Sequence, residues 1–341
     1  MGNTSSAEAR QTFCFYAFRF HFRARDELFF PAGKAGNVVR GAFGTIFRRL
    51  ACVPECTDAR TCPRRRICPY ARIFEPASLG ELPSGLADLP RPFVFRAAHL
   101  DGLVIRPAQP FHFDVHIFEL RDPALFYFVR AFAELAREGL GPERGRAELF
   151  RVDQLGADRE RLSEVFDGES ILAGRTLPPI ELSLAPCRLP VDRVRVRFRT
   201  PTELKAAGKP VLQPEFGILF ARIRDRISTL RALYGPGPLE IDFRGMGERA
   251  ARVRLVRSGL NWVALARLSS KTGRRHPLGG FIGEAEYEGE LAEFLPYLEA
   301  ARWTGVGRQT VWGKGEIEVE APDFNSGPAT AASLTSGRAR K

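Results

Sequence analysis

The sequence predicts an α+β fold made of two halves of similar design, each with helices covering one face of an antiparallel sheet. Two observations favour this class. Residues 13–25 and residues 193–199 both read as strands in which apolar residues alternate with arginines. Each is followed by a segment with helical spacing and then by further alternating runs. A chain of 341 residues with 44% hydrophobic content is long and apolar enough for about two cored domains.

In the first half, the strand has period two from Phe18 onward. One face is apolar and the other carries cations and a histidine: Phe18, Phe20, Phe22 and Ala24 against Arg19, His21, Arg23 and Arg25. Residues 36–50 then have apolar residues at helical spacing, which predicts a helix. Residues 111–120 alternate as a strand, and residues 123–138 predict a second helix.

The second half repeats this plan. After the strand at 193–199, residues 216–235 predict a helix that stops at Gly235. Alternating runs predict strands at 239–243 and 251–256, and a shorter helix is expected at 290–300. The proline-rich stretch 176–192 is the expected junction. We therefore expect domains at 12–178 and 190–322, flanked by disordered segments at 1–11 and 323–341.

Two successive units of strand, helix, strands, helix and strand indicate tandem ferredoxin-like (RRM-like) domains, with a cysteine-rich insertion in the first. Both helices of such a domain cover one sheet face, so the other face is free to bind. We expect the two arginine rows on that free face or against the partner domain. An ordinary solvated charged face is the alternative for each row.

The charge favours a polyanionic partner. The formal net charge is +11, and arginine supplies most of the 51 basic residues. An arginine excess suits phosphate groups and base edges. No apolar run reaches the roughly 18 residues needed to span a bilayer, and the first residues lack a signal-peptide pattern. We therefore expect a cytoplasmic protein that does not enter a membrane.

Four cysteines cluster within seventeen residues, with spacing C-x3-C-x5-C-x5-C: Cys52, Cys56, Cys62 and Cys68. Without a signal peptide, clustered cysteines more often hold metal than form disulfides. Four thiolates can close a tetrahedral structural zinc site, and an iron–sulfur cluster is the alternative. The remaining cysteines, Cys14 and Cys187, are expected to be inert.

Near its end the chain reads TGVGRQTVWGKGEIEV (304–319), which contains four glycines within eleven positions. Glycine lets backbone amides approach a phosphate closely and permits positive φ, and Arg308 and Lys314 add charge. A nucleotide-binding P-loop does not fit, because Gly315 follows Lys314 where Ser or Thr should bind magnesium. The plain alternative is a glycine-rich hairpin before the last strand.

This segment resembles the G-x-G-x5-G-x-G loop of RAMP-superfamily CRISPR proteins. Three other blocks, FRTPTELK (198–205), residues 269–298 and residues 38–76, look like the Cas-six group of precursor-CRISPR-RNA processing endoribonucleases. The resemblance runs from about residue 13 to residue 320. It implies that the glycine-rich loop lies against bound repeat RNA, and similar cysteines in related proteins favour zinc.

The resemblance also implies a cleavage reaction that needs no catalytic metal. A base removes the proton of a 2′-hydroxyl, the oxygen attacks the adjacent phosphate, and an acid protonates the leaving 5′-oxygen, giving a 2′,3′-cyclic phosphate. Histidine suits this task near neutral pH. Many relatives place a catalytic histidine in or just after the first helix, and this chain has none between residues 22 and 98.

Three residues are candidates for proton transfer. His21 ranks first because it faces out from a cationic strand. His276 follows because it lies in the basic, glycine-flanked segment KTGRRHPLGG, and Tyr70 lies beside the cysteine cluster. His112 and His116 lie four residues apart, which is about 13 Å along a strand. This separation is too long for both rings to bind one metal ion, so we expect surface or interface histidines there.

The predicted RNA contacts come from the first strand, the first helix, the 269–298 block and the glycine-rich loop. They are Arg19, Arg23, Arg40, Lys271, Arg274, Arg275, Gly305, Gly307, Arg308, Gln309, Gly313, Lys314 and Gly315. The expected partner is CRISPR repeat RNA, with other Cas proteins of an effector complex as further partners. Two alternatives stay open: a catalytically silent RAMP subunit that binds guide RNA, and a general nucleic-acid-binding module.

Overall fold

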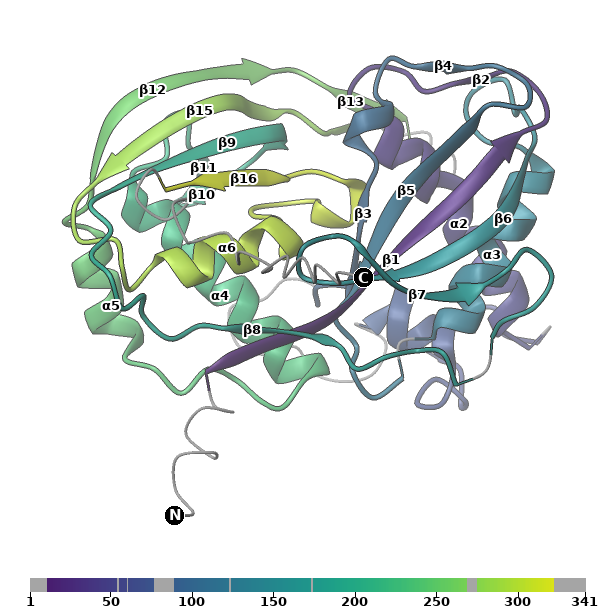
Figure 1. Cartoon of the computed structure of the whole chain (residues 1–341), viewed down its shortest axis with the longest axis horizontal. Helices are drawn as coiled ribbons and strands as arrows, with labels where there is room; N and C mark the ends of the chain where they lie inside the picture. Colours follow the sequence, from purple (N-terminus) through teal and green to yellow (C-terminus); the bar gives the residue numbers. More distant parts are fainter. Residues whose placement is uncertain are drawn as a thin grey trace, which may run out of the picture.

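The computed structural model contains the two predicted halves side by side (Figure 1). It describes residues 11–321 except for residues 54, 60, 77–88, 123, 173 and 269–274, and it leaves out the side chains of residue 42, residues 267–268 and residues 275–277. The segments expected to be disordered, 1–11 and 323–341, fall almost entirely outside the described residues. Within these limits each half has the strand order of a ferredoxin-like sheet, which confirms the predicted fold class.

The first half is built on an antiparallel sheet in the order β3–β5–β1–β6–β7, and β8 pairs with the N-terminal end of β1. Helices α2 (Ala35–Ala51) and α3 (Leu125–Glu138) pack together on one face of this sheet. Its strands are β1 (Thr12–Ala24), β3 (Phe93–Arg96), β5 (Pro110–Ile117), β6 (Ala147–Leu155), β7 (Arg161–Phe166) and β8 (Ile180–Ser183). A small ribbon pairs β2 (Leu28–Phe29) with β4 (Val104–Ile105).

The second half has the sheet order β12–β15–β9–β16, with α4 (Phe216–Tyr234) and α6 (Leu295–Thr304) on one face. Its strands are β9 (Arg193–Thr202), β12 (Arg254–Val263), β15 (Gly280–Glu288) and β16 (Ile317–Glu320). This half also contains two separate two-stranded sheets: β10 (Lys205–Ala206) with β11 (Lys209–Pro210), and β13 (Ala266–Leu268) with β14 (Arg275–Pro277).

The predicted helices occur close to their expected bounds, but the strand predicted at 239–243 is wrong. Residues 239–242 form no strand, and α5 (Phe243–Ala250) begins at the end of that segment. The carboxylate of Asp242 accepts a hydrogen bond from the Gly245 amide at 2.9 Å, which caps the helix. The short helix expected at 290–300 lies instead at Leu295–Thr304.

Strand β1 belongs to both cores. Its first part buries Phe13, Phe15 and Ala17 in the core of the second half. From Phe18 onward the alternating apolar residues are buried in the core of the first half. The consecutive residues Ala17 and Phe18 are both fully buried, on opposite faces of the strand. One continuous strand therefore ties the two halves together.

The C-terminal end of α6 forms the second tie between the halves. The last carbonyl groups of a helix lack partners inside the helix. Here the Trp303 carbonyl accepts hydrogen bonds from Arg96 Nη2 and His116 Nδ1, both at 2.9 Å. The Thr304 carbonyl accepts one from Arg226 Nε at 3.1 Å. Since Arg96 and His116 lie on the first sheet, these bonds fix the end of α6 against the first half.

The His116 contact predicts a pH-dependent stability. Burial, followed by the charge of Arg96, lowers the pKa of His116 to about 3. The unfolded chain takes up this proton near pH 6.5, so the unfolding free energy should fall by up to ~1.4 kcal/mol per pH unit as pH drops below 6.5. In denaturant titrations at pH 7, 6 and 5, His116→Gln should show a shallower pH dependence than wild type. Equal dependences would contradict the assignment; His99→Gln, at an exposed ring, is the control.

Candidate nucleic-acid interface

The glycine-rich loop joins α6 to β16, and all four of its glycines have positive φ: 70° at Gly305, 81° at Gly307, 73° at Gly313 and 67° at Gly315. Residues other than glycine rarely adopt these φ angles. A β-carbon at Gly315 would overlap the carbonyl oxygen of Val306, and one at Gly307 would lie 2.5 Å from that of Glu203. The glycines are therefore required by the packing of the loop itself, whatever the loop binds.

The loop packs against the start of α2 in the first half. A β-carbon at Gly36 would lie 2.5 Å from the carbonyl oxygen of Trp312, so the two segments are in close contact. Lys314 donates a hydrogen bond to the Gly33 carbonyl at 2.8 Å and is 4% exposed. The Arg40 guanidinium lies 3.5 Å from the centre of the Trp312 ring. Of the predicted RNA contacts, Lys314 and Arg40 thus point into the contact between the halves.

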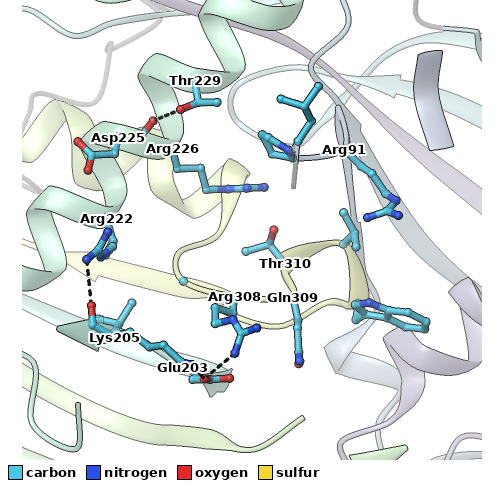
Figure 2. A pocket seen from close by; sticks show the side chains of 16 residues that line it. Arg91, Glu203, Lys205, Arg222, Asp225, Arg226, Thr229, Arg308, Gln309 and Thr310 are labelled. Atoms are coloured by element: carbon cyan, nitrogen blue, oxygen red, sulfur yellow. Dashed lines mark hydrogen bonds and ion pairs between the residues drawn. The ribbon is translucent and has the colours of Figure 1, made fainter. Parts of the chain in front are cut away.

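Other residues of the loop line a pocket of about 640 Å³. In Figure 2, Arg308, Gln309 and Thr310 of the loop lie opposite side chains of α4, with Arg91 at one side. Five cationic residues line the pocket against two acidic ones: Arg91, Lys205, Arg222, Arg226 and Arg308 against Glu203 and Asp225. The pocket is therefore a cationic hollow whose wall includes the exposed part of the glycine-rich loop.

The ionic contacts in this pocket leave cationic groups available. Arg308 is 54% exposed and pairs with Glu203 at 3.0 Å, while Lys205 lies 3.8 Å from the same carboxylate. Burial, followed by the charge of Arg96, lowers the pKa of Arg226 to about 9. Arg226 Nη2 has no hydrogen-bond partner among the described residues. A partly desolvated guanidinium attracts an anion more strongly than one in bulk water.

The arginine row of the second half lies on the helix-free sheet face, as predicted, but glutamates on the neighbouring strands neutralise it. Arg195 pairs with Glu286 at 2.8 Å, and Arg197 pairs with Glu284 at 2.6 Å. Arg193 and Arg199 have partners of the same kind, Glu288 and Glu318. The alternative of a solvated, paired charged face therefore describes this row better than a free cationic surface does.

The row of cationic residues and His21 in the first half lies on the helix-free face of the first sheet, and two of its members contact aspartates. Arg19 pairs with Asp114 at 2.8 Å. His21 Nε2 lies 2.8 Å from a carboxylate oxygen of Asp153, which is 2% exposed. Burial and the charge of Arg151 lower the pKa of His21, so its ring is neutral near pH 7. A neutral imidazole held by a buried carboxylate can accept a proton.

Two more histidines lie beside His21, which the sequence did not predict. His21 is opposite His112 in the β1–β5 register, with ring centres 5.9 Å apart. The exposed His99 stacks on His112 at 4.7 Å, and its Nε2 lies 2.8 Å from the His112 carbonyl oxygen. Burial lowers the pKa of His112 to about 4. His116, by contrast, is buried at the contact between the halves, in agreement with the expected interface role.

The other candidates for catalysis are less accessible or lie outside the described residues. Tyr70 is 6% exposed, and its hydroxyl donates to Glu75 at 2.9 Å; burial raises its pKa. The backbone of His276 and Arg275 pairs within β13–β14, but their side chains are not described. Lys271 and Arg274 lie outside the described residues.

The four clustered cysteines follow the end of α2. The sulfur atoms of Cys52 and Cys68 lie 4.0 Å apart. Burial and the neighbouring thiols Cys68 and Cys56 raise the pKa of Cys52 to about 12, while Cys56 also contacts Cys62. Four thiolates around one zinc ion would be about 3.8 Å apart, given Zn–S bonds of about 2.3 Å. In the described part of the chain no group of three or more ligands is arranged as a formed metal site.

Comparison with known proteins identifies the second half. Residues 196–317, which include the glycine-rich loop, match the family of the CRISPR-associated endoribonuclease Cas6. In this half the chain resembles the Cas6 family. Residues 13–177 match AF_1859_N, a family described as an N-terminal domain. No curated protein matches the chain in sequence.

Solved structures share its fold. A Cas6 product complex is 17% identical with a TM-score of 0.50, over 90% of this chain and 99% of that one. A partial Cas6-RT-Cas1–Cas2 complex is 11% identical with a TM-score of 0.50, over 96% of this chain and 48% of that one. Cas6 from Thermus thermophilus, 18% identical over 90% of this chain and 98% of that one, has a TM-score of 0.49. At these identities the likeness extends to the fold alone. Among the residues that the structure describes, no helix is long and apolar enough to cross a membrane.

The loop geometry predicts a large difference between two glycine-to-alanine substitutions. Gly315→Ala places a β-carbon at positive φ against the Val306 carbonyl, and should destabilise the protein by about 3 kcal/mol or more. Gly41→Ala, in α2 with no heavy atom within 4 Å of the new carbon, should be neutral or stabilising by up to about 1 kcal/mol. Thermal or denaturant unfolding measures both. Similar stabilities for the two variants would contradict the packing role of the loop.

Proposed function

We propose that this chain binds CRISPR repeat RNA and cleaves precursor CRISPR RNA within its repeats. The observation that carries the proposal is the cationic pocket between α4 and the glycine-rich loop, which lies in the segment matched by the Cas6 family. Five cationic side chains there suit the phosphates of one RNA strand. One solved structure of the same fold is a Cas6 product complex, and another joins Cas6 to Cas1 and Cas2, so other Cas proteins are proposed partners.

The proposed reaction is a metal-independent transesterification. His21 accepts the proton of a ribose 2′-hydroxyl, and the oxygen attacks the adjacent phosphorus. The bond from phosphorus to the 5′-oxygen breaks, and that oxygen takes a proton from solvent. The products are a 2′,3′-cyclic phosphate and a free 5′-hydroxyl. Asp153 positions the His21 ring through the 2.8 Å contact.

A cleavage assay in EDTA tests the proposal. Wild-type protein with repeat RNA should give a product ending in cyclic phosphate, and added EDTA should leave the rate unchanged. Tight binding with intact RNA would instead favour a silent RAMP subunit. Binding that ignores the repeat hairpin and depends only on salt would favour a general nucleic-acid-binding module.

The same assay tests the role of His21. A positioned base contributes roughly 10²–10⁴-fold, so His21→Ala should slow cleavage at least tenfold. Unchanged cleavage by His21→Ala would indicate that His276 or Tyr70 acts as the base. The matched control is His99→Ala, which removes an exposed ring from the same sheet face.

We also propose that the four clustered cysteines hold a structural zinc ion. The donor chemistry supports this, since all four thiols are free and Cys52, Cys56, Cys62 and Cys68 form a chain of neighbouring sulfurs. Zinc would hold them as thiolates and fix the arginine-rich segment between Cys62 and Cys68 at the end of α2. It has no part in the cleavage chemistry.

Metal analysis tests the zinc site directly. One zinc per chain is expected by elemental analysis of the purified protein. Cys52→Ser and Cys68→Ser should each lose the metal and lower the melting temperature, because one closed ligand set is broken. Cys14→Ser and Cys187→Ser, outside the cluster, should keep it. A wild-type protein without zinc, prepared with zinc supplied, would end this proposal.

A further inference from the structure

Strand β6 contains an irregularity beside His21. In the β1–β6 register, Phe22 is opposite Leu149 and His21 is opposite Arg151, so Phe150 is an extra residue in the pairing. Such a bulge breaks the alternation of side chains and re-aims the residues around it. Leu149 and Val152 are both buried, while Phe150 and Arg151 between them are both partly exposed. The bulge therefore brings an aromatic ring and a guanidinium together on the helix-free face.

Phe150 is the first of four aromatic rings in a row, which are carried by three strands and by the short 3-10 helix Ala98–Leu100. The centres of the Phe150 and His21 rings are 6.0 Å apart, followed by 5.9 Å from His21 to His112 and 4.7 Å from His112 to His99. β1 and β5, which carry His21 and His112, are the central strands of the sheet (Figure 1). Phe150, His21 and His112 are partly exposed, and aromatic rings in this position on a sheet can stack on bases.

Cations lie over the same ring. The guanidinium carbon of Arg23 is 5.2 Å from the centre of the Phe150 ring, and that of Arg151 is 6.0 Å away. Arg23 is exposed and forms no ion pair with a carboxylate of the described residues. Arg19 and Arg151, in contrast, are engaged by Asp114 and Asp153. Arg23 is thus the cation of this group that is free to contact a phosphate.

From this arrangement we propose that Phe150, His21 and Arg23 form a binding site for one unpaired nucleotide of RNA. The base stacks on Phe150, and Arg23 contacts the adjoining phosphate or covers the other side of the base. Aromatic stacking with a nearby cation is how proteins hold single strands without reading their sequence. A base inside a duplex cannot reach this surface, so the ligand is an unpaired nucleotide.

This inference rests on the proposed function and adds to it the position at which the RNA is cut. A nucleotide stacked on Phe150 lies directly beside His21, the residue proposed to accept the 2′-hydroxyl proton. The chain should therefore cut next to an unpaired nucleotide, at the edge of a repeat hairpin and not within its stem. The identity of that base should matter little, since every base has a face that can stack.

Binding of a short single strand tests the site. The probe is an oligoadenylate hexamer with one 2-aminopurine, whose fluorescence is quenched by stacking. Phe150→Leu keeps an apolar side chain at the bulge but removes the aromatic face, and should weaken binding about fivefold or more and abolish the quenching. Phe150→Trp should bind like wild type. Phe126→Leu, at an exposed phenylalanine of α3, is the matched control and should change nothing.

The outcomes separate this site from the proposed function. Unchanged hexamer affinity and quenching in Phe150→Leu would overturn the stacking site, and cleavage of repeat RNA by the same variant would leave the proposed function intact. Loss of binding in both Phe150→Leu and Phe150→Trp would also overturn it, because stacking survives in tryptophan. If wild type neither binds nor cuts repeat RNA but holds the hexamer through Phe150, the site stands and the proposed function fails.

Discussion

The hydrogen bonds to the last carbonyl groups of α6 fix the glycine-rich loop, and with it the cationic pocket that is proposed to bind RNA. Arg96 and His116 of the first sheet and Arg226 of α4 donate to two consecutive carbonyls, and the glycine-rich loop starts at the next residue. A β-carbon at Gly305 would already lie 3.3 Å from Arg96 Nη2. The loop therefore cannot shift against the first half without breaking these bonds. The shape of the cationic pocket follows from this contact, because Arg226 and the loop form two of its walls.

The same contact joins the pocket to the histidine-bearing face of the first sheet. Arg96 is opposite Asp114 in the β3–β5 register, and Asp114 binds Arg19 on β1. His21 and His112 lie two residues further along their strands, a distance of about 7 Å. Strand β1 contributes to both cores and so joins this face directly to the second half.

The period and spacing of the apolar residues were enough to predict the architecture. They did not predict which side chains contact each other across strands. Burial of alternate residues from Phe18 to Ala24 follows from the sequence pattern, as do the helices at 36–50 and 216–235. The His21–Asp153 contact and the bulge at Phe150 depend on strand register, which tertiary packing sets. A signal for the paired arginines was present: Glu284, Glu286 and Glu288 alternate in the sequence just as the arginines do. Opposed rows of period two predict a salt-bridged sheet face.

The pairing of these arginines with glutamates means that the net charge of +11 does not by itself locate the RNA-binding surface. An overall excess of arginine points to a polyanion but not to a place on the molecule. The second sheet carries the densest arginine row in the sequence, yet Glu284, Glu286, Glu288 and Glu318 offset it. Cationic residues outnumber acidic ones in the pocket beside the glycine-rich loop, and Arg23 pairs with no carboxylate among the residues that the structure describes. Since phosphate binding depends on uncompensated charge, the RNA path should follow these two places and avoid the arginine row of β9.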